Sequence, residues 1–213
     1  MKYSLILLKF AIVIVILLVW MVYYPNLPDM MPIHWNMLGV ADNFAPKSQA
    51  IYIFPGVVLF MLILFQFLPK IDPKRENYPK FEKTWEIFQF SILIFFAYMY
   101  VIIILAAMDP GINVNKYIML WIGTLFVILG NYMGKIRKNY FVGFRLPWTI
   151  DNEEVWNKTH RLGWKMFMIG GLIFIANAFL NLYLIGMTIL IISIILIIPI
   201  VYSYTIFRKL KKL

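Results

Sequence analysis

The chain has 213 residues, of which 62% are hydrophobic and 14% charged, and its mean hydropathy is +0.80. Soluble domains are about one quarter charged, so this composition excludes an ordinary soluble protein and indicates an integral membrane protein. The formal net charge of +10 is spread over four segments, which argues against direct binding of nucleic acid, and the absence of cysteine excludes disulfides and thiolate metal sites.

Six apolar runs follow one another along the chain, and each is close to the ~20 residues that a helix needs to cross the hydrocarbon core. The first run is not followed by a small-residue cleavage site, so it is interpreted as a retained anchor whose Lys9 extends back to the lipid headgroups. We predict an all-α, polytopic membrane protein with about six transmembrane helices, forming a single membrane domain over residues 1–213. The runs cover roughly residues 5–24, 51–68, 87–107, 117–133, 164–180 and 183–207.

Lysine and arginine lie almost entirely on one side of the expected spans. The N-terminus carries two, the connection after the second span five, the connection after the fourth span seven, and the C-terminal tail four. The opposite side has only Lys47 and Lys116. By the positive-inside rule, both termini and both basic loops are predicted to be cytoplasmic.

The predicted outer loop, residues 25–50, is rich in proline, which disfavours helix, and we expect an ordered, irregular cap. Its polar side chains match no metal-ligand spacing. Two interpretations stay open: a structural role, with His34 and Trp35 packed near the membrane interface, or recognition of an extracellular ligand. The candidates for extracellular recognition are Pro28, Asp29, Pro32, His34, Trp35, Asn36, Gly39 and Asp42.

The predicted cytoplasmic loop, residues 134–163, contains the signals of a helix start. Asp151 is the expected N-cap, Glu154 follows three residues later, and Gly163 can end the helix. We expect a short amphipathic cytoplasmic helix that lies on the inner leaflet before the fifth span. The residues that share its apolar face at helical spacing are Val155, Trp156, Thr159 and Leu162.

The same loop has two possible functions. Its tryptophans and arginines can anchor it to lipid headgroups, or Arg145 and Trp148, which flank a proline on a turn, can form an anchor for a cytoplasmic protein. The candidate residues for binding a cytoplasmic partner are Gly143, Arg145, Pro147, Trp148, Thr149, Trp156, Thr159 and Arg161.

Both loops resemble known families. The inner segment GFRLPWT at 143–149, with NEEVW at 152–156 and KTHR at 158–161, resembles the cytoplasmic signature of the SdpI family of bacterial immunity proteins. The outer segments LPD at 27–29 and PIHWN at 32–36, with Gly39 and Asp42, resemble the DUF1648 domain that often accompanies it. Leu146 departs from the family pattern, in which a threonine is expected.

The resemblance implies a multi-pass protein of the bacterial plasma membrane that protects its cell against a secreted antimicrobial peptide toxin. It further implies a toxin sensor that recruits a small cytoplasmic repressor protein to the membrane. On this basis residues 1–68 form a DUF1648-like region with spans one and two, and residues 117–207 form an SdpI-like region with spans four to six. The expected partners are membrane lipids, the toxic peptide and the repressor.

The principal alternative is a small-molecule or peptide transporter or exporter. Coupled transport needs ionisable groups inside the membrane, and no charged residue lies deep within the five later runs. The polar residues in those runs are expected to form hydrogen bonds between helices; they are Gln66, Gln89, Asn131 and Asn177.

Catalysis is not expected, because the two histidines are predicted on opposite faces of the membrane and cannot form a catalytic pair or share a metal. No cofactor and no metal are expected.

Overall fold

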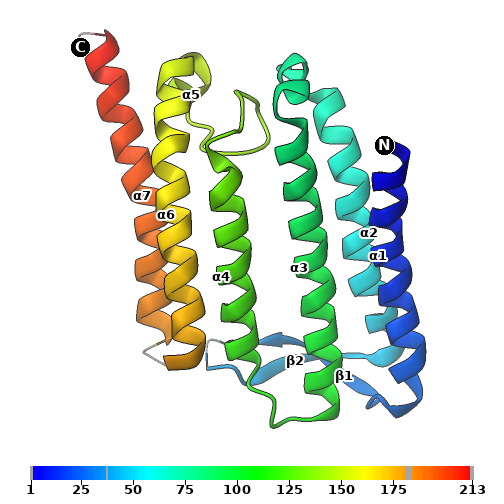
Figure 1. Cartoon of the computed structure of the whole chain (residues 1–213). Helices are drawn as coiled ribbons and strands as arrows, with labels where there is room; N and C mark the ends of the chain where they lie inside the picture. Colours follow the sequence, from blue (N-terminus) through cyan, green and yellow to red (C-terminus); the bar gives the residue numbers. More distant parts are fainter. Residues whose placement is uncertain (1, 37, 181–183, 212–213) are drawn as a thin grey trace.

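The computed structural model describes residues 2–36, 38–180 and 184–211, and six long helices run side by side in it (Figure 1). All six are long and apolar enough to cross a membrane, which confirms the predicted all-α polytopic fold. Each is longer than its apolar run because polar residues continue the helix at one or both ends. The helices are α1 (Lys2–Tyr23), α2 (Lys47–Ile71), α3 (Glu82–Met108), α4 (Val114–Met133), α6 (Glu153–Leu180) and α7 (Leu184–Lys211).

The two ends of the bundle differ in structure. One end, here called the basic end, holds the chain termini, the short helix α5 (Pro147–Asp151) and the 3-10 helix η2 (Arg75–Phe81) (Figure 1). The other, the hairpin end, holds the 3-10 helix η1 (Tyr24–Asn26) and two strands. Both termini and both basic loops therefore share one end, as expected, while the side of the membrane that this end faces stays a prediction.

The loop between α1 and α2 forms a β-hairpin, which the sequence reasoning missed when it expected an irregular cap. Strand β1 (Met30–Trp35) pairs antiparallel with β2 (Ala41–Pro46), and the register is irregular on both sides of His34. The Asn36 side chain accepts hydrogen bonds from two backbone N–H groups of the turn at 2.9 and 3.1 Å. A two-stranded ribbon tolerates prolines because each strand is an edge strand.

Two groups of helices meet along the contact between α3 and α4. One hydrophobic core lies among α1, α2 and α3, reaches the hairpin, and continues at the basic end to Met133, Phe144 and Trp156. A second core lies among α4, α6 and α7. The helices α4 and α6 approach most closely where Gly123 faces Gly171, since a Cβ on either residue would lie 2.6 Å from the carbonyl oxygen of the other. Gly130 of α4 is also tightly enclosed, since a Cβ there would lie 2.9 Å from Cβ of Phe167, whereas a Cβ on Gly134 would meet nothing closer than 3.8 Å.

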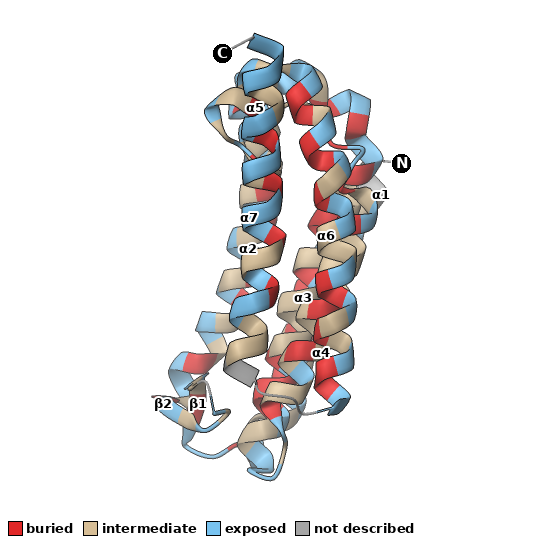
Figure 2. Cartoon of the chain, turned by 90° about the vertical axis from the view of Figure 1, so that its left-hand side faces the viewer, coloured by how far each residue is buried: buried red, intermediate tan, exposed pale blue. Residues whose placement is uncertain are grey.

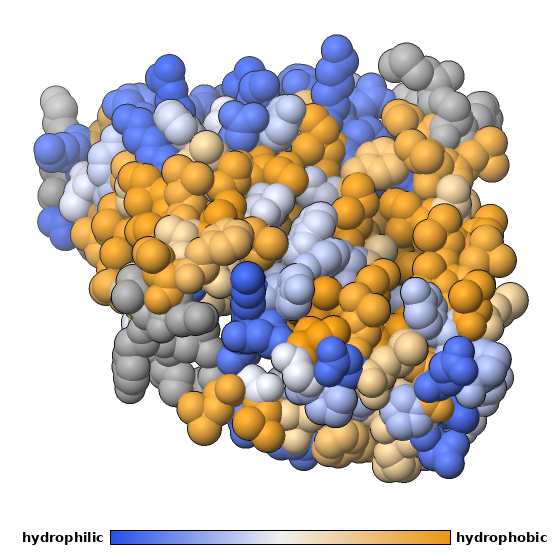
Figure 3. All heavy atoms as spheres, turned by 60° about the horizontal axis from the view of Figure 1, so that its bottom comes forward, coloured by the Kyte–Doolittle hydropathy of each residue, from blue (hydrophilic) through white to orange (hydrophobic). Residues whose placement is uncertain are grey.

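The outer surface of the bundle matches a bilayer environment. Buried residues lie on the inward faces of the helices, whereas much of the outer face of α7 is exposed (Figure 2). The exposed side chains include Leu18 of α1 and Leu196 of α7. Figure 3 shows a hydrophobic band between the hydrophilic basic end and the mixed surface of the hairpin end. This is the pattern of a protein whose middle section faces lipid.

Candidate functional site

The connection after α4 is a tight turn organised by the buried side chain of Asn139. Its Oδ1 accepts hydrogen bonds from the N–H groups of Phe141 at 2.8 Å and Val142 at 2.7 Å. Its Nδ2 donates to the carbonyls of Arg137 at 2.9 Å and Val142 at 3.1 Å. The amide is thus fully used inside the turn, which holds the following segment in one conformation. The sequence analysis did not identify this residue.

Gly143 brings the turn against α6. Its φ of +104° lies in the left-handed region, and a Cβ at this position would lie 2.1 Å from Nε2 of His160. That nitrogen accepts a hydrogen bond from the N–H of Phe144 at 3.0 Å, and Nδ1 lies 2.8 Å from the carbonyl of Trp156. Because Nε2 accepts, the hydrogen of the neutral ring is assigned to Nδ1, which donates to that carbonyl. Glycine is therefore required here by the backbone conformation and by the close approach of His160.

The short helix α5 is fastened to its neighbours through two side chains. The buried hydroxyl of Thr149 donates to the carbonyl of Phe144 at 2.6 Å and accepts from the N–H of Leu146 at 2.9 Å. The indole N–H of Trp148 donates to Oγ of Ser203 in α7 at 2.8 Å. Trp148 thus ties α5 to α7.

The amphipathic helix expected before span five is not a separate element. Helix α6 runs unbroken over Glu153–Leu180, so the predicted segment forms its first turns. Its N-cap is Asn152 and not Asp151, since the Asn152 Oδ1 accepts hydrogen bonds from two N–H groups of the first turn at 2.9 and 3.1 Å. Gly163 does not end the helix. It is buried, and a Cβ there would lie 2.5 Å from the ring of Phe144.

The apolar face of this segment packs inside the protein and does not lie on a lipid leaflet. The side chains of Val155, Trp156 and Thr159 are all 0% exposed. The Trp156 indole donates to the carbonyl of Ile136 at 2.9 Å. Three candidates for partner binding, Trp156, Thr159 and the equally buried Thr149, therefore support the turn from inside and cannot offer their side chains to a partner.

The remaining inner candidates reach the surface. Arg145, Pro147 and Arg161 are exposed, while Gly143 and Trp148 are half-buried. The Arg145 guanidinium donates to the carbonyl of Tyr140 at 3.0 Å, so the turn positions it. An open groove of about 430 Å³ lies beside it; the groove is lined by Tyr140, Gly143, Phe144, Arg145, Leu146, Ile150 and Ile200.

A buried carboxylate joins the two basic loops. Asp72, which follows α2 and is 2% exposed, accepts hydrogen bonds from the Tyr78 hydroxyl at 3.0 Å and the Tyr140 N–H at 2.9 Å. The Asn77 side chain donates to the carbonyl of Lys138 at 2.9 Å. The two loops therefore form one structure at the basic end. Asp72 is far from Tyr140 in sequence, and no local pattern singled it out.

The outer candidates gather on the hairpin but differ in accessibility. His34 and Asp42 form a cross-strand pair with Nδ1 and Oδ1 2.5 Å apart, and both are exposed. Asp29 is exposed and pairs with Lys47 at 3.2 Å. Pro28 is exposed and Pro32 is buried, while Trp35, Asn36 and Gly39 are partly buried. The side chain of Asn36 is occupied in shaping the turn. Recognition by the exposed members stays a prediction.

Lys9 does not extend to the headgroups as expected. Its side chain is 1% exposed, and Nζ donates to the Glu86 carboxylate and, at 2.8 Å, to Oε1 of Gln89 in α3. Gln66 of α2 donates to the same Oε1 at 3.2 Å, so these two glutamines form the kind of interhelical hydrogen bond expected of the polar residues in the spans. Glu86 lies just outside the third apolar run but inside α3. Lys9 and Glu86 thus form an ion pair between α1 and α3 near the basic end.

The two histidines lie at opposite ends of the bundle, His34 in the exposed hairpin and His160 in the buried turn. Within the described residues, no group of three or more His, Cys, Asp or Glu side chains is arranged to hold a metal ion. The hydrogen-bond partners of His160 are both backbone groups, so its arrangement is that of a structural side chain.

Comparison with known proteins agrees with the two segments that carried the resemblance. Residues 135–203 match the model of the SdpI/YfhL protein family, and residues 11–59 match a domain of unknown function, DUF1648. The chain is 26% identical over 191 residues to "Immunity protein SdpI" of Bacillus subtilis (strain 168), which covers 89% of each chain. No solved structure matches the chain.

Proposed function

We propose that this chain, a member of the SdpI/YfhL protein family in the bacterial cell membrane, is an immunity factor that protects its cell against a secreted, membrane-active peptide. The observation that carries the proposal is the similarity to an immunity protein over 89% of both chains, which includes both loops. A role in binding, without catalysis, agrees with this similarity and with the structural use of His160.

The hairpin end is the proposed site of peptide recognition. It exposes large hydrophobic side chains, among them Leu38 at 77%, beside the charged pair of His34 and Asp42. Figure 3 shows hydrophobic and polar side chains intermingled on this end. A membrane-active peptide is itself amphipathic, so a mixed surface at the predicted outer membrane interface suits it. Binding there would keep the peptide from inserting into the bilayer.

The turn at the basic end is the proposed site for a cytoplasmic repressor. Arg145 is exposed and positioned by Tyr140 beside the groove of about 430 Å³, and Pro147 and Arg161 are also exposed. Trp148 supports this site indirectly, because its hydrogen bond to Ser203 holds α5 against α7. A rigid turn that presents an arginine over a partly apolar groove can bind a protein at low entropic cost.

Survival tests the first part of the proposal. Bacillus subtilis cells that lack Immunity protein SdpI would be grown with wild-type cells, with and without this chain. We expect the chain to restore survival. In parallel, the reconstituted chain should reduce the dye leakage that a secreted, membrane-active peptide toxin causes in liposomes. Failure in both assays would contradict the immunity function.

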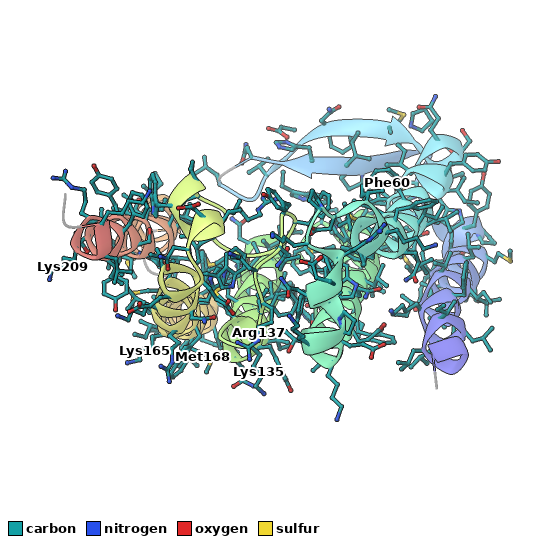
Figure 4. The ribbon with its side chains drawn as sticks, turned by 90° about the horizontal axis from the view of Figure 1, so that it is seen from above. Phe60, Lys135, Arg137, Lys165, Met168 and Lys209 are labelled. Carbon is teal, nitrogen blue, oxygen red and sulfur yellow. The ribbon has the colours of Figure 1, made fainter. Side chains whose placement is uncertain are left out.

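Substitution of Arg145 tests the partner site separately. Arg145→Lys keeps the charge but loses the planar guanidinium, so it should weaken repressor recruitment and leave simple lipid attraction intact. Lys165→Arg, at an exposed lysine of the same end, is the matched control (Figure 4). If a small cytoplasmic repressor is encoded beside the gene, both variants would be compared at equal abundance by its co-purification. If Arg145→Lys recruited the repressor fully, Arg145 would not be a partner-binding residue, and the interpretation that this loop anchors to lipid headgroups would stand.

One observation favours the alternative function, a small-molecule or peptide exporter. The Lys9–Glu86 pair places two ionisable groups within α1 and α3, whereas the sequence analysis expected the Lys9 ammonium at the headgroups and left Glu86 outside the third apolar run. However, the pair is engaged with Gln89 and lies close to one end of both helices. We therefore expect protection in liposomes without an imposed gradient. Protection that requires a pH or sodium gradient would favour the exporter.

A further inference from the structure

The contact between α3 and α4 leaves an apolar cleft inside the predicted membrane region. It has a volume of about 170 Å³ and is lined mainly by hydrophobic side chains, including Phe90, Ile94, Trp121, Leu125 and Ile128. The two hydroxyls in its lining are turned to their own helices, since Ser91 donates to the carbonyl of Ile87 and Thr124 to that of Leu120, both at 2.7 Å. The cleft therefore offers no hydroxyl donor to a polar ligand and suits a hydrocarbon chain.

A second pocket, polar and basic, lies at the basic end of the same two helices. It has a volume of about 350 Å³ and is lined by Asn77, Lys80, Arg137, Lys138 and Glu153. Three cationic groups and one carboxylate give the lining a formal charge of +2. Among the described residues, no carboxylate forms a salt bridge with Arg137 or Lys138. The pocket is thus electrostatically suited to an anion.

Hydrogen bonds fix the backbone and side chains that surround the basic pocket. Asn77 donates to the carbonyl of Lys138 at 2.9 Å, and Nζ of Lys80 donates to Oδ1 of Asn77 at 2.7 Å. The carbonyl of Arg137 is fixed by the buried Asn139. These bonds hold the segment before α3 and the segment after α4 together at the basic end of the α3–α4 contact. This contact, with its apolar cleft and its basic pocket, is called the α3–α4 seam below.

The two pockets lie at a spacing that suits one lipid molecule. Ile87 lies in the second turn of α3, which begins directly after Lys80 and Phe81, and Ile128 lies in the last two turns of α4, which ends at Met133 shortly before Arg137. The two pockets are therefore separated along the bundle by roughly 10 Å. Half of a bilayer, from its midplane to the outer edge of the headgroups, is about 20 Å thick. A phosphate held in the basic pocket would therefore allow an acyl chain to enter the apolar cleft.

We propose that the α3–α4 seam binds one anionic phospholipid, with its phosphate held by Lys80, Arg137 and Lys138 and an acyl chain in the cleft beside Phe90 and Trp121. A free phosphate would leave the apolar cleft without an occupant. The bound lipid would bridge α3 and α4, and the basic residues Arg137 and Lys138 of its phosphate site lie in the segment that matches the SdpI/YfhL family model.

The experiment uses the purified 213-residue chain in phosphatidylcholine nanodiscs that contain increasing amounts of phosphatidylglycerol. The protein is released from the nanodiscs, and the lipid molecules that stay bound to it are counted by native mass spectrometry. Arg137→Gln combined with Lys138→Gln should weaken retention of one phosphatidylglycerol by at least about tenfold, since each basic residue near an anionic membrane contributes about a factor of five. The matched control is Lys165→Gln combined with Lys209→Gln, which removes the same charge at the same end but outside the seam (Figure 4).

A third variant tests the acyl chain. Thr124→Leu fills the cleft without changing charge and should reduce retention of phosphatidylglycerol, whereas its thermal unfolding should be close to that of the wild type because Thr124 is only half-buried. The proposal is overturned if the control pair loses as much lipid as the seam pair, because attraction would then be nonspecific. It is also overturned if glycerol phosphate binds as tightly as the lipid and Thr124→Leu has no effect, because the pocket would then recognise phosphate alone.

Discussion

Replacement of Lys9 by methionine is expected to destabilise the helix bundle measurably. Methionine keeps most of the length and the apolar stem of the side chain but removes the ammonium group that donates to Glu86 and Gln89. Breaking a fully buried ion pair by removing one partner costs about 3–5 kcal/mol, because an unpaired charge is left behind. The Glu86 side chain is 27% exposed and can recruit some water, so we expect a loss of about 2–3 kcal/mol.

Thermal unfolding of the purified protein in detergent, followed by tryptophan fluorescence at a fixed scan rate, measures this loss. At 2–4 °C per kcal/mol for a chain of this size, the apparent Tm of Lys9→Met should fall by about 4–12 °C. The variant Glu86→Gln should also lower Tm, because it leaves the Lys9 ammonium, which is 1% exposed, without its carboxylate.

The double variant Lys9→Met with Glu86→Gln completes the cycle. Since it contains neither charge, it should be less destabilised than the two single changes together, with a coupling energy of at least about 1 kcal/mol. An unchanged Tm in Lys9→Met, or strictly additive losses in the double variant, would refute the assignment of a buried, mutually dependent pair.

The other predictions concern the turn and the topology. Gly143→Ala should cost about 3 kcal/mol because it combines a left-handed backbone with a Cβ that clashes with His160, and a Tm close to the wild-type value would contradict this account. Gly134→Ala is the control, since a Cβ there meets nothing closer than 3.8 Å. In intact cells, Ser48→Cys at the hairpin end should react with an impermeant thiol reagent, whereas Arg75→Cys at the basic end should react only after permeabilisation. The reverse labelling pattern would invert the predicted topology.

Several features of this protein could be predicted from the amino-acid sequence. The six spans were recognised because a hydrophobic run of sufficient length is a local signal, and the bilayer leaves helices as the one structure such runs can form here. The grouping of the basic loops and termini at one end follows from the even number of spans. The segments at 143–149 and 32–36 pointed to the two family models that match the chain because their residues are contiguous, so no knowledge of the fold was needed to compare them.

Other features were decided by tertiary structure. Lys9 is 77 positions from Glu86, Asp72 is 68 from Tyr140, and neither pairing leaves a trace in local periodicity. The face of α6 that carries Trp156 was correctly recognised as apolar, but an apolar face packs equally well against lipid or against protein, and only the position of the neighbouring turn places it inside. The hairpin was missed because its prolines argue against strands in general, whereas a two-stranded ribbon has only edges and accepts them. Local sequence determines which segments leave water; long-range packing determines which side chains those segments then meet.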